Sequence, residues 1–286
     1  RMYGNIVLDG IVYTEGDKVI DIPELVIKVE RHKIDDVFSI KSKLGEFEII
    51  GKIEFTSIVN DFMHQFDKVF PGLVNTPITN KPDSKSKSRF TYDFKTNQTE
   101  DFLAIFAPDL KIKSGTELKG SYDGNSEDFS MKLTSGLITY KDYKFEGIDL
   151  DQKLTSTSIV ADYHIDFLQY GDSIRIQDVF FTTAGQNNIL HSDLMWNQNI
   201  NNASHIGWET IIVDNTQLLM QLEPSYFSIN DQRWEIEKSS DILLSNVDIH
   251  VSNFKLSRES QYIAVDGCIS RNDNDKLNFR VNDINL

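Results

Sequence analysis

The strongest constraint on the fold is a period of two in hydrophobicity that recurs along the chain. In several segments apolar side chains alternate with polar or charged ones. A β-strand points successive side chains to opposite faces, so each of these segments predicts a strand with one apolar face. The apolar positions that alternate most clearly are Phe38, Ile40, Val247, Ile249, Val251, Ile263, Val265, Leu277, Phe279 and Val281.

The segments between the predicted strands consist of turn-forming residues. Examples are Asp123–Asn125, Tyr170–Asp172, Gly185–Asn188, Asn199–Asn202 and Arg271–Asp275. Asn, Asp and Gly adopt the backbone angles of tight turns at little cost. Because few helical patterns lie between the strands, the sequence favours an antiparallel meander over βαβ units.

Two segments carry a helical period instead. Residues 57–70 have apolar side chains three and four positions apart, with Ser57 as a candidate N-cap and Pro71 just past the end. Residues 100–106 predict a shorter helix before Pro108. The organisation predicted is a β segment over 1–75 that ends in an amphipathic helix, a polar loop over 76–90, and a continuous β segment over 91–286.

Composition excludes several classes of function. The formal net charge is −15, which argues against a nucleic-acid partner because phosphate binding needs clustered Lys and Arg. The single cysteine, Cys268, cannot form an intrachain disulfide or a thiolate-rich zinc site. No apolar run is long enough to span a membrane as a helix. Strand-like residues near both ends favour an excised part of a longer chain.

Motifs for catalysis are absent from the sequence. The six histidines are scattered, and there is no nucleophile elbow, phosphate-binding loop or dinucleotide fingerprint. The acidic turns at 123–128 and 273–275 offer oxygen ligands for calcium, but such residues are also the usual residues of turns. We interpret Cys268 as a small residue within a strand. The three tryptophans are interpreted as side chains that pack on an apolar face. We therefore expect a protein that is not an enzyme, with no catalytic residue, metal or cofactor.

One family resemblance runs through most of the chain. It is carried by Phe102–Tyr122 (Phe-Leu-Ala-Ile-Phe-Ala-Pro-Asp-Leu, a strand, Gly-Thr, a strand and Gly-Ser-Tyr), by Leu137–Leu150, and by segments of Phe227–Phe279. This rhythm of strands and turns resembles the TamB family, the AsmA-like envelope proteins of Gram-negative bacteria, in the form seen in Bacteroidetes. No site residues transfer with the resemblance, because the family has no discrete site motif to match.

The resemblance implies both a fold and a function. The fold expected is an elongated, strongly curved antiparallel sheet, a β-taco trough, with one or two short helices. The function expected is that of a periplasmic segment, anchored in the inner membrane elsewhere in the full-length protein. It would carry phospholipid acyl chains along an apolar groove between the inner and outer membranes and support outer-membrane biogenesis. An outer-membrane barrel protein is the further partner implied. The ten alternating residues named above are the candidates for lining the groove.

Three alternatives stay open at this point. The apolar face could be the closed core between two sheets, which alternation alone does not distinguish from an open groove. The chain could be an adhesin or carbohydrate-binding β-sandwich, for which an exposed aromatic platform would be the sign. A glycoside-processing enzyme would need two close carboxylates in a cleft.

Overall fold

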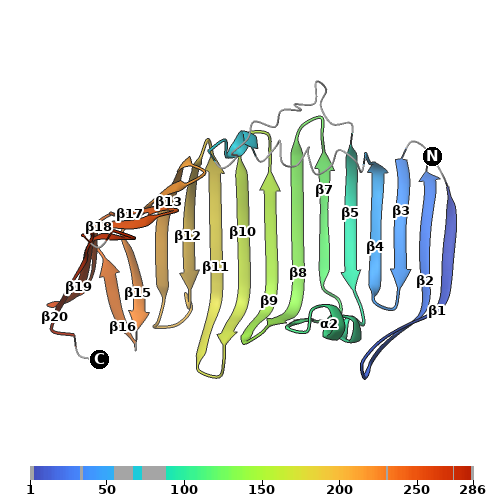
Figure 1. The fold of residues 1–286 in the computed structure, drawn as a ribbon, viewed down its shortest axis with the longest axis horizontal. Helices are drawn as coiled ribbons and strands as arrows, with labels where there is room; N and C mark the ends of the chain where they lie inside the picture. The colour runs from blue at the N-terminus through green and yellow to red at the C-terminus, as the bar shows by residue number, and fades with distance from the viewer. Residues whose placement is uncertain are drawn as a thin grey trace. The chain divides into compact units, whose positions relative to one another are not determined.

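The strands of the protein form one antiparallel sheet. The computed structural model describes residues 3–32, 35–54, 67–72, 88–229, 231–272 and 274–284. Twenty strands belong to a single sheet (Figure 1). The prediction of a nearly all-β chain built on one antiparallel sheet is therefore confirmed. Among the described residues, no helix is long and apolar enough to cross a membrane.

The chain divides into two compact units, and the division falls within two strands. The first unit holds β1 Gly4–Glu15, β2 Lys18–His32, β3 Asp35–Ser42, β4 Gly45–Lys52, β5 Arg89–Thr96, α2 Glu100–Phe106, β6 Leu110–Ile112, β7 Glu117–Asp123, β8 Asp128–Tyr140, β9 Tyr143–Leu154 and most of β10 Ile159–Tyr170. It also includes the first residues of β11 Ile174–Gln186.

The second unit holds the remaining strands. They are the rest of β11, β12 Ile189–Trp196, β13 Ser204–Asp214, β14 Gln217–Leu222, β15 Ser225–Ile229, β16 Gln232–Ile236, β17 Ser240–Ser245, β18 Asp248–Arg258, β19 Gln261–Ser270 and β20 Leu277–Asn282. Residues 67–72 also belong to this unit, and the Val69 carbonyl accepts a hydrogen bond from the Asn188 amide.

The connectivity is the predicted meander, in which strands pair with their neighbours in the sequence. Some long strands are interrupted. β14 and β15 both pair with β13, while β16 and β17 pair with β15 and β14 respectively. β18 in turn pairs with both β16 and β17 and carries a register shift between Val251 and Phe254. The interruptions therefore lie on neighbouring strands and bend this part of the sheet.

The sheet of the first unit has one apolar and one charged face, which follows from its register because paired residues share a face. The apolar face of the first unit consists of Ile6, Leu8, Leu25, Ile27, Val29, Phe38, Ile40, Phe47, Ile49, Phe90, Tyr92, Phe94, Leu118, Tyr122, Phe129, Met131 and Leu133. Its buried centre is Ile49, Phe90 and Tyr122. Aromatic rings continue the packing on both sides of this centre.

The opposite face of the first unit carries ion pairs between adjacent strands. Lys41 pairs with Glu46 at 3.2 Å, and Lys95 pairs with Glu117 at 3.0 Å. Lys119 contacts Asp93 on β5 at 3.6 Å and also Glu117 on its own strand at 2.9 Å. These pairs are exposed, so each stabilises the fold little, but together they keep this face hydrated.

The predicted helices have different outcomes. The helix predicted at 100–106 is confirmed as α2, whose Phe106 ring packs against Tyr13 with ring centroids 5.5 Å apart. Of the helix predicted over 57–70, residues 57–66 lie outside the described residues, and 67–69 are helical. Most of the predicted loop over 76–90 also lies outside them, and β5 begins at Arg89.

Candidate functional site

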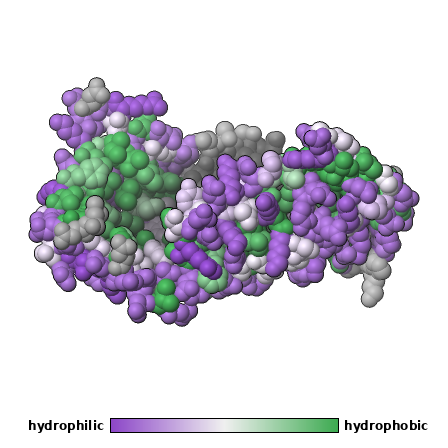
Figure 2. Space-filling view, turned by 90° about the horizontal axis from the view of Figure 1, so that it is seen from below, coloured by the Kyte–Doolittle hydropathy of each residue, from purple (hydrophilic) through white to green (hydrophobic). Residues whose placement is uncertain are grey.

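The second unit presents an apolar face that is partly exposed. The register of β12 to β20 assigns apolar side chains from every strand to this face. They are Leu190, Leu194, Trp196, Ile206, Trp208, Ile212, Leu218, Met220, Leu222, Phe227, Ile229, Trp234, Ile236, Ile242, Leu244, Ile249, Val251, Phe254, Leu256, Ile263, Val265, Ile269, Leu277, Phe279 and Val281. Figure 2 shows apolar side chains gathered around a hollow at the end of the view where β13–β20 lie.

One part of this face is closed. Leu222, Trp234, Ile236 and Leu256 form a buried cluster, although all four belong to the same face of one sheet. Ile284, which follows β20, packs against this cluster. The sheet of the second unit therefore curls until the end of the described chain reaches the apolar side chains of its middle strands.

The other part of the face is open. Phe279 is 65% exposed, Val281 62%, Ile269 53% and Ile249 40%. Side chains of this kind are normally buried, and a contiguous exposed group of them marks a surface that binds something. The open part lies over β18, β19 and β20, beside the closed cluster and on the same face.

The ten residues predicted to line a groove do not all meet at one place. Ile249, Val251, Ile263, Val265, Leu277, Phe279 and Val281 share the apolar face of the second unit. Phe38 and Ile40 are half-buried on the apolar face of the first unit, where Phe38 contacts the Phe47 ring at 6.2 Å. Val247 is exposed in the turn before β18, so its face is not fixed by strand pairing.

Sequence reasoning missed much of the closed cluster. Leu218, Leu219 and Met220 are consecutive apolar residues, so no alternation marks which of them face the cluster. The three tryptophans do lie on the predicted apolar face, and Trp234 is its most buried aromatic at 6% exposure. The alternation Arg233, Trp234, Glu235, Ile236 was the signal that could have placed this strand.

The described histidines of the second unit, His191, His205 and His250, lie on its polar face, and two of them pair with carboxylates of strands β12 and β13. His205 contacts Asp193 at 2.7 Å, and His191 contacts Glu209 at 3.2 Å.

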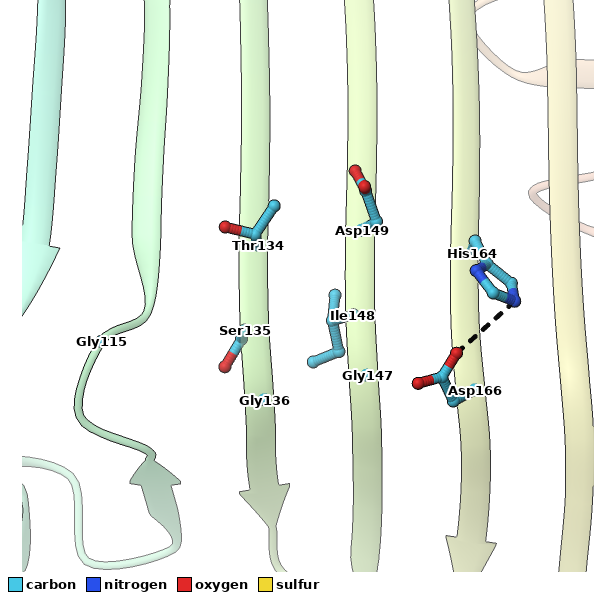
Figure 3. Close-up of a pocket in the computed structure, with 9 residues that line it drawn as sticks. All are labelled: Gly115, Thr134, Ser135, Gly136, Gly147, Ile148, Asp149, His164 and Asp166. Carbon is cyan, nitrogen blue, oxygen red and sulfur yellow. Dashed lines mark ion pairs between the residues drawn. The ribbon is translucent and has the colours of Figure 1, made fainter.

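A polar depression of about 420 Å³ lies in the first unit (Figure 3). Thr134, Asp149, His164 and Asp166 line it, and His164 Nε2 lies 3.8 Å from an Asp166 oxygen. The nearby Ser135 hydroxyl is 2.6 Å from Thr116 Oγ1, so it is engaged away from the histidine. Within the described residues, no three His, Cys, Asp or Glu side chains are grouped so that they could hold a metal ion.

Cys268 lies half-buried on β19, opposite His250. Burial, together with the charges of Asp275 and Asp248, raises the pKa of its thiol. A raised pKa disfavours the thiolate, so this cysteine is poorly suited to act as a nucleophile.

Comparison with known proteins gives no relative: no protein-family model, no curated protein and no solved structure matches the chain.

Proposed function

We propose that this chain is a segment of an AsmA-like, TamB-type protein of the bacterial periplasm, with its inner-membrane anchor elsewhere in the full-length protein. In this proposal the chain carries phospholipid acyl chains along an apolar sheet face between the inner and outer membranes. It performs no chemistry of its own, and an outer-membrane barrel protein is its proposed partner at the far membrane.

The observation that carries the proposal is the exposure of Ile249, Ile269, Phe279 and Val281 on one continuous apolar face. A closed core would leave these side chains covered. Their neighbours Leu222, Trp234 and Leu256 on the same face are covered, so exposure is confined to part of the surface.

The energetics of such a face suit a hydrocarbon ligand. Each methylene removed from water contributes about 0.8 kcal/mol, so even part of an acyl chain gains several kcal/mol on this surface. Binding of this kind needs no oriented catalytic group. The polar residues of the opposite face, such as His250 and Arg280, keep the protein hydrated while the ligand stays on the apolar side.

Site-specific photo-crosslinking in Gram-negative cells tests the proposal. A crosslinking residue at Ile249 or at Phe279 should give phospholipid adducts. His250 and Arg280 are matched controls, because each is the next residue on the same strand and points to the opposite face. Adducts at the first pair and not at the second are expected. Equal labelling at all four positions, or none at any of them, would refute the proposal.

The alternative of a carbohydrate-binding module has one observation in its favour. The rings of Tyr143 and Tyr170 are exposed in the first unit, with centroids 4.7 Å apart. However, the described strands form one sheet, whereas that alternative predicts a two-sheet sandwich. A Tyr143→Ala, Tyr170→Ala double variant tests it, because a glycan-binding platform would lose retention on polysaccharide columns.

A further inference from the structure

The apolar face of the second unit contains a cation at one end. In strands β12 to β20, Arg258 is the one charged side chain that the register places on this face. Arg258 is the last residue of β18 and pairs with Gln261, the first residue of β19. It therefore lies at the rim of the face, where a charge can stay hydrated.

Two neutral side chains hold the Arg258 guanidinium. Its Nη1 donates hydrogen bonds to the amide oxygens of Gln232 and Gln261. Gln261 is itself fixed, because its Nε2 donates to the Asp283 carbonyl at 2.8 Å. Both acceptors are uncharged, and no ion pair to Arg258 occurs among the described residues, so its positive charge is oriented without being neutralised.

The guanidinium retains donors for a ligand. Arginine has five N–H donors in a planar fork, and the two amide oxygens use only those of Nη1. Such a fork matches the oxygens of a phosphate or carboxylate group.

The exposed apolar side chains begin one same-face row from this cation and two strands across the sheet, on β20. The next same-face row after Arg258 and Gln261 is Leu256, Ile263 and Val281, and the row after that is Phe254, Val265 and Phe279. Same-face rows are on the order of 7 Å apart, since each residue of a strand advances about 3.4 Å. A charged head at Arg258 would thus leave a hydrocarbon chain to cross these rows towards Val281 and Phe279, which lie two strands away on β20.

We propose that Arg258, oriented by Gln232 and Gln261, binds the anionic head of an amphiphile whose hydrocarbon chain lies along the apolar face of the second unit. This inference rests on the proposed function, and it adds that the ligand is anionic and that its head is bound at a defined end of the face.

The test compares two ligands that share a chain and differ in the head. Dodecyl phosphate and dodecanol, each below its aggregation limit, displace N-phenylnaphthylamine from the protein, and its fluorescence reports the loss. The protein should prefer dodecyl phosphate by about tenfold, as expected for hydrogen bonds to a charged group. Arg258→Gln should remove this preference and leave the affinity for dodecanol unchanged.

Three further measurements separate a head-binding role from a structural one. Arg280→Gln is the matched control, since Arg280 lies on the opposite face and its loss should preserve the preference. Arg258→Lys keeps the charge without the fork and should retain part of the preference. Added salt should weaken dodecyl phosphate binding to the unaltered protein and leave dodecanol binding unchanged.

The outcomes also separate this inference from the proposed function. Equal affinities for the two ligands, or a preference that survives Arg258→Gln, overturn the head-binding role while acyl-chain binding stands. Failure of both ligands to displace the probe overturns the proposed function and this inference with it.

Discussion

The phenol ring of Tyr92 lies across Gly120, its partner on the neighbouring strand. The two residues are paired between β5 and β7, and the Tyr92 hydroxyl donates a hydrogen bond to the Ser130 carbonyl on β8 at 3.0 Å. The ring reaches that carbonyl only because position 120 has no side chain. One glycine thus lets a single tyrosine connect three strands on the apolar face of the first unit.

The first prediction concerns Gly120→Ala. An added Cβ would lie 2.0 Å from the Ser130 carbonyl oxygen and 2.3 Å from the Tyr92 hydroxyl, so ring and strand must both move. We expect a loss of about 2 kcal/mol or more in unfolding free energy, measured by urea denaturation. Gly136→Ala on β8 is the control, because its nearest contacts, at 3.2 Å, are with the flexible Lys113 side chain. Similar losses in both variants would contradict this explanation.

The second prediction is an alkaline titration. Burial raises the pKa of Tyr92 to about 12, above its ordinary value of 10.0. The unfolded chain ionises this tyrosine at lower pH than the folded one does, so its contribution to stability is complete below pH 10 and falls between about 10 and about 12. Unfolding free energy measured across this range should fall more steeply for the unaltered protein than for Tyr92→Phe. If unfolding free energy fell with pH equally in both proteins, burial would not raise the pKa of Tyr92, contrary to this explanation.

A third prediction separates the closed and open parts of the apolar face in the second unit. Trp234 is 6% exposed within the buried cluster, whereas Phe279 is 65% exposed. Trp234→Ala should lose about 3–5 kcal/mol of unfolding free energy, the range for deleting a buried aromatic side chain. Phe279→Ala should change it little and should weaken the binding of hydrocarbon ligands. A large stability loss in Phe279→Ala would mean that this side chain belongs to the core.

A fourth prediction concerns the charged face of the first unit. Hydrogen bonds from Lys119 and Lys95 lower the pKa of the Glu117 carboxyl below its ordinary value. A lowered carboxyl pKa stabilises the fold at neutral pH, and this contribution disappears as the pH falls through the folded pKa. In Lys119→Met the Glu117 pKa, followed by NMR, should rise towards its ordinary value. Lys132→Met, which removes a pair with Asp149, should leave it unchanged.

The sequence predicted the strands well where one face is charged. From Ile263 to Val281, polar residues such as Asp266, Asn278 and Arg280 alternate with apolar ones because they lie on an opposite face that is exposed to water. Around Phe38 and Ile40 the same alternation marks the two faces, although Ser39 is buried. The face of each of these residues could therefore be derived from its neighbours alone.

Two features could not be predicted in this way. The buried cluster at Trp234 depends on the curl of the sheet, which brings Ile284 back to strands that are distant in sequence. The place of Arg258 depends on the register shift in β18 between Val251 and Phe254, because a slip of one residue moves a side chain to the other face. Neither the curl nor the shift leaves a periodic signal.

The pairing of strands with their sequence neighbours makes length an adjustable property of this architecture. Where each strand contacts mainly the ones before and after it, a hairpin can be inserted or deleted without disturbing distant contacts. Natural variation in such a chain should therefore come in steps of two strands. The length of the sheet can then change hairpin by hairpin, at nearly constant stability per residue.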